Sequence, residues 1–284
     1  MCAGLRPFSW PTSTRRLGVV DRPSEQLRRA RLVVAYRGAG FRGFAANPGV
    51  RTVMGVLVAE MERVLRRPVE LTGAGRTDAG VHAWGQVVSG DVPADTDLDD
   101  LARRLNKLCA PDVAVRTAEW AGPDFDARFS ATWRQYRYHV WNDPAPNPLL
   151  DGVVWHVARS LDFAAMQRAA RDLVGEHDFT SFCRIPKVPE GESEPSMTRL
   201  LHEASWSRLD GSSLLRFEVR GSAFCHQQVR SMVGTLVDVG LGRLDPTCIP
   251  SVLELRDRAA AGQVAPPEGL VLWAVGYGGR RWDA

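Results

Sequence analysis

The chain has 284 residues, of which 44% are hydrophobic and 24% are charged, and its formal net charge at pH 7 is +3. This composition is typical of an ordinary globular protein and excludes a polybasic one. The length suits one large domain or two of roughly 100–150 residues each. No apolar run approaches the roughly 18 residues of a membrane span, and the N-terminus lacks the apolar core of a secretory signal, so no membrane contact is expected.

The five cysteines are odd in number and widely spaced, and no two of them form a CxxC pair. This spacing indicates neither a zinc site nor a disulfide framework, and it favours a reducing, cytoplasmic location. The cations are almost all arginines, because Lys107 and Lys187 are the only lysines. A planar guanidinium suits phosphates and stacked bases, although genome base composition or simple surface filling would produce the same bias.

The first half of the chain alternates strand and helix patterns. Residues 1–28 hold three prolines without apolar periodicity, which predicts a flexible leader. The pattern then predicts a strand at 31–36, a helix at 52–66 with Thr52 as N-cap, strands at 69–71 and 86–92, a helix at 98–109 and a strand at 113–120. This order favours an α/β sandwich with the helices on one face of a sheet whose strands pair antiparallel.

The second half repeats this β/α alternation loosely, beyond a boundary near residues 122–129. The pattern predicts strands at 132–141 and 153–157, a helix at 161–174, a hairpin of 197–209 and 213–224 around Asp210-Gly211, helices at 226–240 and 250–261, and a strand at 270–277. Residues 186–195 are polar and rich in proline, so we expect a mobile surface insertion there.

Two glycine-rich stretches suggest different chemistries. Residues 38–43 fit G-x-G-x-x-G after a strand, but a turn at Asn47-Pro48-Gly49 stands where a dinucleotide fold needs a helix. Residues 71–83 read LTGAGRTDAGVHA, and Gly75 and Gly80 have the glycine spacing of a phosphate-binding loop without its lysine and hydroxyl.

Asp78 is the most reactive group of this second stretch. Asp78 and His82 are four residues apart, yet a loop with three glycines will not keep helical spacing and no third ligand lies near, so no metal is expected. Asp78 can act as nucleophile or as acid/base, and it then needs a cation partner, either Arg76 or Arg230. The alternative is a glycine-rich turn whose aspartate caps backbone amides.

The motifs around Asp78 resemble those of a known family. Residues 73–83 resemble the signature of the TruA-type pseudouridine synthases, enzymes that isomerise uridine in tRNA. Four further stretches resemble that family's motifs in the same order, at 126–138, 175–182, 223–236 and 269–272. The resemblance covers roughly residues 31–277.

The resemblance implies an α/β fold of the α+β type. Two ferredoxin-like subdomains would form one mixed, largely antiparallel sheet flanked by helices, with a central cleft. After the leader at 1–28, the N-terminal subdomain with the catalytic loop is expected at 29–122 and the C-terminal subdomain at 123–284. The resemblance also implies a homodimer in which one tRNA contacts both subunits.

The resemblance also assigns roles to single residues. It implies that Asp78 is the catalytic aspartate, which attacks the extruded nucleotide at its base or its ribose. Tyr136 would stack on the target base and take part in proton transfer at C5, and Arg230 would pair with Asp78 and keep it ionised. Arg76 would assist base extrusion and contact the RNA together with Thr77. The expected substrate is uridine at tRNA positions 38–40, in the anticodon stem-loop, and no cofactor is expected because the reaction has no net oxidation or hydrolysis.

The segment after the first strand departs from the family pattern. Arg37 stands in place of an acid, Phe44-Ala45 in place of a Trp-Gln pair, and Met54 in place of a glutamine. These changes leave the target position open and keep in view an inactive relative that binds tRNA without isomerising it. A third alternative, a nucleotide-binding hydrolase or oxidoreductase, rests on the glycines of residues 38–43.

Overall fold

The computed structural model describes residues 26–185, 188, 195–209 and 213–278. The predicted leader up to residue 25, nearly all of the predicted insertion at 186–195, and the predicted turn at Asp210-Gly211 lie outside the described residues. The strands are β1 (Leu27–Tyr36), β2 (Leu71–Gly73), β3 (His82–Pro93), β4 (Val113–Trp120), β5 (Ala131–Trp141), β6 (Trp155–His156), β7 (Gly175–Asp178), β8 (Thr198–Arg208), β9 (Leu214–Gly221) and β10 (Leu270–Tyr277). The α-helices are α1 (Val53–Leu65), α2 (Leu98–Leu108), α3 (Phe163–Arg171), α4 (Gln228–Gly240) and α5 (Ile249–Leu255).

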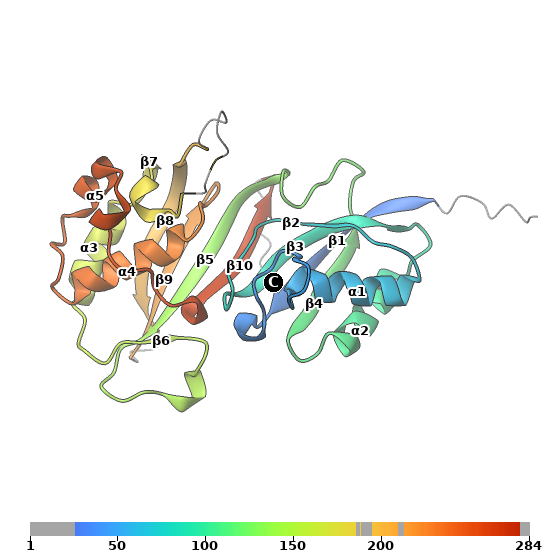
Figure 1. Cartoon of the computed structure of the whole chain (residues 1–284), viewed down its shortest axis with the longest axis horizontal. Helices are drawn as coiled ribbons and strands as arrows, with labels where there is room; N and C mark the ends of the chain where they lie inside the picture. Colours follow the sequence, from blue (N-terminus) through green and yellow to red (C-terminus); the bar gives the residue numbers. More distant parts are fainter. Residues whose placement is uncertain (1–25, 186–187, 189–194, 210–212, 279–284) are drawn as a thin grey trace, which may run out of the picture.

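These strands form one sheet in the order β4-β1-β3-β10-β5-β9-β8-β7, with β2 paired to β3 and β6 paired to β5 (Figure 1). The β3–β10 and β5–β6 pairs are parallel, and the other pairs are antiparallel. The predicted mixed, largely antiparallel sheet is therefore confirmed.

Each half of the sheet has the same internal order. In the first half, β1, β2, β3 and β4 lie in the spatial order β4-β1-β3-β2, with α1 and α2 between the strands along the chain. In the second half, β5, β8, β9 and β10 lie in the order β10-β5-β9-β8, with α3 and α4 in the corresponding places. Both halves thus show the fourth-first-third-second order of a β-α-β-β-α-β unit, which confirms two ferredoxin-like units. The exact division at residue 122 stays a prediction.

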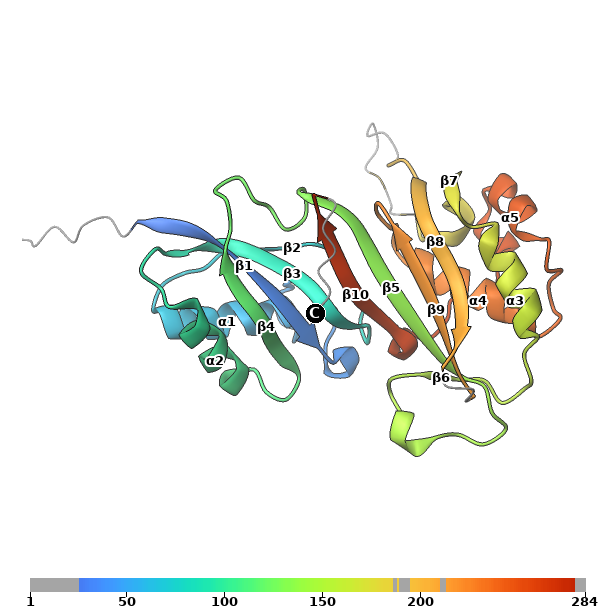
Figure 2. The same ribbon diagram turned by 180° about the vertical axis from the view of Figure 1, so that it is seen from behind.

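The helices lie on one face of the sheet. In Figure 1 α1 and α4 lie in front of the strands, and in Figure 2 the strands lie in front of these helices. Helix α1 begins after Thr52, whose side chain accepts a hydrogen bond from the Gly55 amide, as its predicted N-cap role requires. Its Val53, Leu57 and Met61 side chains are buried in the core. Amphipathic packing of this kind, more than helix propensity, stabilises such helices.

The two halves meet where β3 runs beside β10. Val271 pairs with His82, and Leu272 pairs with Ala83. Leu272 also pairs with Tyr136 of β5 on its other side. The start of β3, directly after the glycine-rich loop, is therefore held close to Tyr136 by the register of the sheet alone.

Several predicted boundaries differ from the structure. β1 starts at Leu27 and not at 31, because its first residues pair with the end of β3, so it takes the last two residues of the predicted leader. The predicted strand at 153–157 is reduced to β6, and the predicted helix at 250–261 ends at Leu255, where Arg256 turns left-handed with φ 49°. The edge strand β7 was not predicted, because its four residues carry no alternating apolar pattern. Among the described residues, no helix is long and apolar enough to cross a membrane.

Candidate active site

The loop between β2 and β3, residues 74–81, carries Asp78 and is called here the catalytic loop. Its first residues are bonded to β3, and its last residues are closed by a turn within the loop. The Ala74 amide donates to the Val87 carbonyl at 2.8 Å, and the buried Gln86 side chain donates to the Gly75 carbonyl at 2.7 Å. At the far end, the Val81 amide donates to the Asp78 carbonyl at 3.2 Å. The catalytic loop is therefore a hydrogen-bonded turn and not an unanchored segment.

Residues 38–43 pack against the catalytic loop. Residues 38–40 form one 3₁₀ turn instead of the long helix that a dinucleotide fold requires. A Cβ atom on Gly38 would lie 2.1 Å from the Val81 carbonyl oxygen, so the two backbones touch where only glycine fits. Gly38 thus serves the contact between two loops, and this contact explains the glycine without a bound nucleotide.

Asp78 contacts Arg230, in the first turn of α4, and His226, in the loop just before that helix. Its Oδ2 atom lies 2.9 Å from Nη1 of Arg230, and its Oδ1 atom lies 3.3 Å from Nε2 of His226. The carboxylate is partly exposed, at 26% of its side-chain surface. It therefore faces cationic and polar donors on one side and remains reachable from solvent on the other.

Arg230 is held by more than the carboxylate. It is the only residue of α4 that is not buried, and its side chain keeps 13% of its surface. Its Nε atom donates to the Ala265 carbonyl at 2.8 Å, and the Ala265 amide donates to the Arg230 carbonyl at 3.1 Å. The guanidinium is thus fixed by the protein before any substrate enters, as preorganised electrostatic stabilisation requires.

Tyr136 lies beneath the catalytic loop on β5. It is 8% exposed, and its ring packs edge-on against Phe224 with ring centroids 5.1 Å apart. Burial raises the pKa of Tyr136 to about 12; the Arg134 guanidinium opposes this shift and the negative charge of Asp78 adds to it. A Cβ atom on Gly75 would lie 3.9 Å from the Tyr136 hydroxyl, so the ring points at the bare backbone of the loop.

Arg134 ties the catalytic loop to the second half of the molecule. Its guanidinium donates to the carbonyl of Ala74 at 3.0 Å and to that of Ser222 at 3.0 Å. It also donates to the carbonyls of Ala131 and Arg128. Sequence reasoning gave this arginine no role, because its partners are backbone groups that no side-chain pattern reveals.

The two predicted RNA-contacting residues lie differently. Arg76 is exposed, and it makes no hydrogen bond or ion pair with any residue that the structure describes. Thr77 is buried, and its hydroxyl lies 2.8 Å from the hydroxyl of Tyr36. The side chain of Thr77 thus anchors the loop, and a direct contact with RNA through it would require this hydrogen bond to break.

His82 does not face Asp78 as a metal partner. Its Nδ1 atom accepts from the Gly38 amide at 3.0 Å, which leaves Nε2 to donate to the Gly152 carbonyl at 3.1 Å. Burial lowers the pKa of His82, in agreement with a neutral ring. Both nitrogens therefore have backbone partners, and no group of three His, Cys, Asp or Glu side chains in the described part of the chain could hold a metal ion.

Two of the departures from the family pattern lie inside the protein. Phe44 is 2% exposed and stacks on Tyr36, with ring centroids 5.9 Å apart. A Cβ atom on Gly73 would meet the Phe44 ring at 2.3 Å and the Met54 methyl at 3.5 Å. Phe44 and Met54 therefore fill the core beside the catalytic loop rather than change its outer surface, whereas Arg37 is exposed.

Sequence reasoning missed His226 and Phe224. Both belong to the stretch 223–236 that was singled out, but nothing in a loop before a helix indicates that His226 turns toward Asp78 or that Phe224 packs against Tyr136. The available signal for His226 was its position four residues before Arg230. Whether its side chain reaches Asp78 depends on the turn between His226 and Arg230, which the sequence does not reveal.

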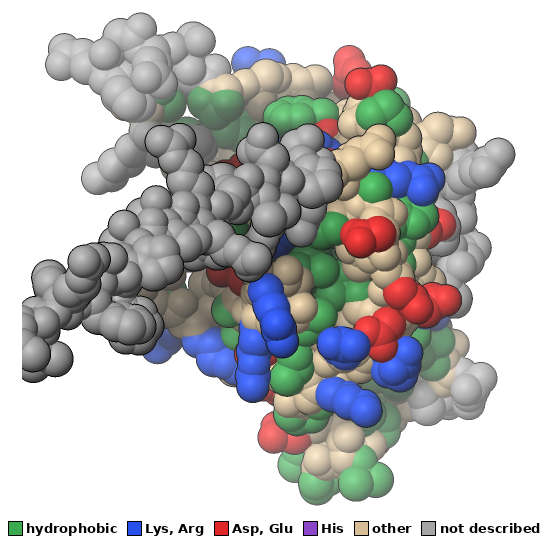
Figure 3. Space-filling view, turned by 90° about the vertical axis from the view of Figure 1, so that its right-hand side faces the viewer, with side chains coloured by type: hydrophobic (Ala, Val, Ile, Leu, Met, Phe, Trp, Pro, Cys, Tyr) green, Lys and Arg blue, Asp and Glu red, His purple; other side chains and the backbone are tan. Residues whose placement is uncertain are grey.

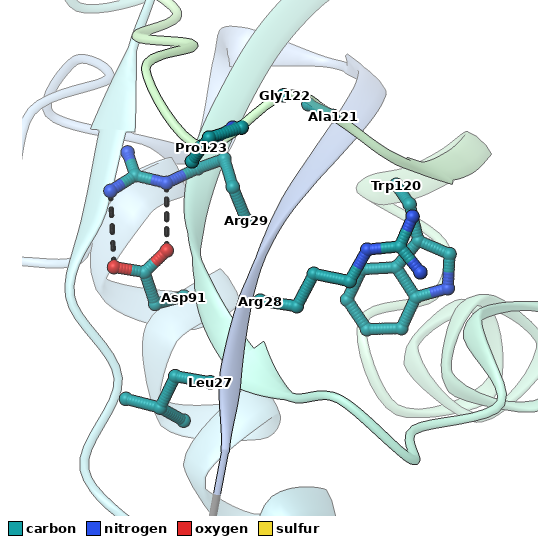
Figure 4. Close-up of a pocket in the computed structure, with 8 residues that line it drawn as sticks. All are labelled: Leu27, Arg28, Arg29, Asp91, Trp120, Ala121, Gly122 and Pro123. Carbon is teal, nitrogen blue, oxygen red and sulfur yellow. Dashed lines mark hydrogen bonds and ion pairs between the residues drawn. The ribbon is translucent and has the colours of Figure 1, made fainter.

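A surface pocket beside the start of β1 is lined by none of the active-site residues described above (Figure 4). It has a volume of about 660 Å³, and Arg28 stacks on Trp120 at its wall with 4.7 Å between the guanidinium carbon and the ring centroid. Its second cation, Arg29, is neutralised by Asp91 through two hydrogen bonds of 2.7 and 3.0 Å. Tyr36, next to the catalytic loop, is at the opposite end of the same strand.

The end of the molecule formed by α1 and α2 carries charges of both signs (Figure 3). Ion pairs join Arg103 and Arg104 to Asp100, and Arg63 to Glu60. Such mixing of charges among the described residues of α1 and α2 is typical of a solvated face.

Comparison with known proteins matches most of the chain. A family model described as tRNA pseudouridine synthase matches residues 32–130 and 169–278. A protein of Methylobacterium nodulans named tRNA pseudouridine synthase A is 43% identical over 250 residues, which cover 88% of this chain and 96% of that protein. Proteins of the same name from Gluconobacter oxydans and Bacillus subtilis are 41% and 37% identical, each over 88% of this chain and over 90% and 99% of their own lengths.

Proposed function

The chain belongs to the tRNA pseudouridine synthase family, and from this premise we propose that it is an isomerase that converts uridine to pseudouridine at positions 38–40 of tRNA, with Asp78 as the catalytic aspartate. One observation carries the assignment of the site. The ion pair of Asp78 with Arg230 joins two family-like motifs that are 152 residues apart in sequence. A glycine turn whose aspartate merely caps its own backbone would not need a fixed arginine from the other half of the sheet.

The reaction balances without an added group. The bond between N1 and C1′ of the uridine breaks, the base turns, and a bond between C5 and C1′ forms. The proton that C5 loses is matched by one that N1 gains, so substrate and product have the same atoms. A carboxylate oxygen of Asp78 forms a covalent bond to carbon of the nucleotide and leaves again, which divides one hard step into two easier ones. The nucleotide must leave the base stack for this oxygen to reach it.

The other site residues have complementary roles in this proposal. Arg230 holds Oδ2 of Asp78 at 2.9 Å and keeps the carboxylate ionised. Tyr136 supplies an aromatic surface and a protonated hydroxyl beside the extruded base. Arg76, exposed on the same loop, can occupy the place of the extruded base or pair with a phosphate.

We further propose that the enzyme works in the cytoplasm as a homodimer on tRNA. The cysteines that the structure describes, Cys109, Cys183, Cys225 and Cys248, are free thiols, which suits a reducing compartment. The stacked indoles of Trp84 and Trp273, of which Trp84 is 41% exposed, carry the guanidinium groups of Arg116 and Arg137 over their rings and offer a mixed aromatic and cationic surface for a second copy. Light scattering of the purified protein tests the dimer, and a monomeric mass at micromolar concentration would exclude it.

The test of the activity is tritium release from tRNA labelled at C5 of uridine. The wild-type chain should release tritium, and Asp78→Asn should lower the rate at least about a thousandfold, because the amide is not a nucleophile. Asp95→Asn, on an exposed side chain away from the site, is the matched control. Tight tRNA binding by the wild-type chain without any release would instead favour the inactive, RNA-binding alternative.

A further inference from the structure

His226 contacts the reactive carboxylate but has no role in the proposed mechanism. Its Nε2 atom lies 3.3 Å from Oδ1 of Asp78, and its side chain is 49% exposed. Arg230, on the other oxygen, is 13% exposed and is fixed by Ala265 as well. The two oxygens of Asp78 therefore have unlike neighbours, one mostly covered and tied to the backbone and the other half exposed.

The backbone on both sides of His226 is fixed by hydrogen bonds. The His226 carbonyl accepts from the Arg184 amide at 3.0 Å, and the Cys225 amide donates to the buried Gln228 side chain at 2.8 Å. Between them, Gln227 adopts a left-handed conformation with φ 65° and ψ 3°. Non-glycine residues rarely adopt this conformation, and it persists where surrounding contacts fix it.

We propose that His226 is a positioning residue for Asp78, and that Oδ1 is the oxygen that it presents to the nucleotide. The inference rests on the proposed function of this site. His226 Nε2 lies 3.3 Å from Oδ1, and in this proposal its N–H donates to Oδ1 along one lone-pair direction and leaves the other free for attack. Arg230 on Oδ2 and His226 on Oδ1 together fix the rotation of the carboxylate about its Cβ–Cγ bond. Without His226, Oδ1 samples orientations that do not lead to reaction.

The test is single-turnover tritium release with saturating enzyme, together with a separate measurement of the Kd for tRNA. We expect His226→Ala to slow the chemical step by roughly tenfold to a hundredfold, with the Kd unchanged within about threefold. We expect His226→Gln, whose amide can donate from nearly the same place as Nε2, to recover most of the rate. His202→Ala, on an exposed histidine of β8, is the matched control and should behave as the wild type.

The outcomes separate the inference from the function on which it rests. A wild-type rate in His226→Ala overturns the inference, and so does an unchanged rate with a weakened Kd, which would make His226 an RNA contact instead. A His226→Gln variant as slow as the alanine variant overturns the donor role. If the wild-type chain releases no tritium, the proposed function itself fails. Thermal unfolding of each variant checks that the expected rate loss occurs without a loss of fold.

Discussion

Tyr136 shows how burial selects the chemistry of a single side chain. Its pKa is raised to about 12, mainly by burial. At pH 7 only about one molecule in 10⁵ carries the phenolate form. The ring therefore works as a neutral surface with a hydroxyl that can donate or relay a proton, and it does not work as a standing base.

Replacing Tyr136 by phenylalanine separates these two properties. Tyr136→Phe keeps the ring against Phe224 but removes the hydroxyl that points at the catalytic loop. We expect the Kd for tRNA to change by less than about threefold and tritium release to slow by about 10²- to 10⁴-fold, the range of general acid–base catalysis. Full release by this variant would leave Tyr136 with a stacking role alone. Tyr277→Phe, which lacks contact with Asp78 and loses a hydrogen bond to Ala127, controls for the loss of a buried hydroxyl.

At the scale of elements, the site depends on the seam between β3 and β10. The catalytic loop enters β3, whereas Tyr136 and Arg230 belong to β5 and α4 in the other half. Two residue pairs make the ladder of this seam, Val271 with His82 and Leu272 with Ala83. Arg134 crosses from β5 to the loop as a second tie. The distance between Asp78 and its partners is therefore set by backbone contact between two strands.

Gly85 lies beside this seam and allows no side chain. A Cβ atom there would lie 2.4 Å from the Trp273 carbonyl oxygen and 3.2 Å from Cα of Ala274. Gly85→Ala must push β3 from β10, and we expect it to lower the free energy of unfolding by about 1–3 kcal/mol, the usual cost of overpacking.

Gly85→Ala should also lower the rate of tritium release at saturating tRNA by at least about tenfold. A displacement of about 1 Å at an active site is enough to cause a rate loss of this size. Urea unfolding and the release assay measure the two quantities. Gly122→Ala, where a Cβ atom would meet nothing within 4 Å, is the control. Equal stability and equal rate in Gly85→Ala and wild type would show that the seam does not set the site.

For the whole molecule, the most direct link between pH and stability is a partly buried histidine. Burial lowers the pKa of His139 to about 4, and the charges of Arg216 and Arg137 act in the same direction. An unfolded histidine binds its proton near pH 6.5. Between pH 6.5 and about 4 the unfolded chain therefore holds a proton that the folded chain excludes, so the free energy of unfolding falls as the pH falls through this window.

His139→Gln should flatten this dependence. The wild-type chain should lose at most about 3 kcal/mol to His139 between pH 6.5 and 4, from 1.36 kcal/mol per pKa unit. The lowered pKa of His82 adds to the loss in the same direction. Urea unfolding at about pH 7 and 4.5 measures the difference, with His202→Gln as control. An identical pH dependence in wild type and His139→Gln would contradict this account.

The local pattern of apolar and capping residues was enough to predict many of the strands and helices. The strands β4 and β10 lie where the alternation predicted them, and Thr52 caps α1 as expected, since hydrophobic period and capping are properties of neighbouring residues. Elements without such a signal escaped prediction. β7 has four mixed residues, and β1 extends to Leu27 only because β3 offers a partner.

The catalytic loop and its aspartate could be identified from the sequence, because glycines around a charged triplet are a local feature and the other motifs follow in the family's order. The amino-acid sequence by itself thus determined the candidate residues, the alternation of strands and helices and the family. Only the tertiary structure decided that His226 shares Asp78 with Arg230, that Phe44 and Met54 are buried, and that Thr77 turns inward to Tyr36. The physical reason is that each of these contacts joins residues far apart in the chain, and the register of the sheet and the left-handed turn at Gln227 place them together.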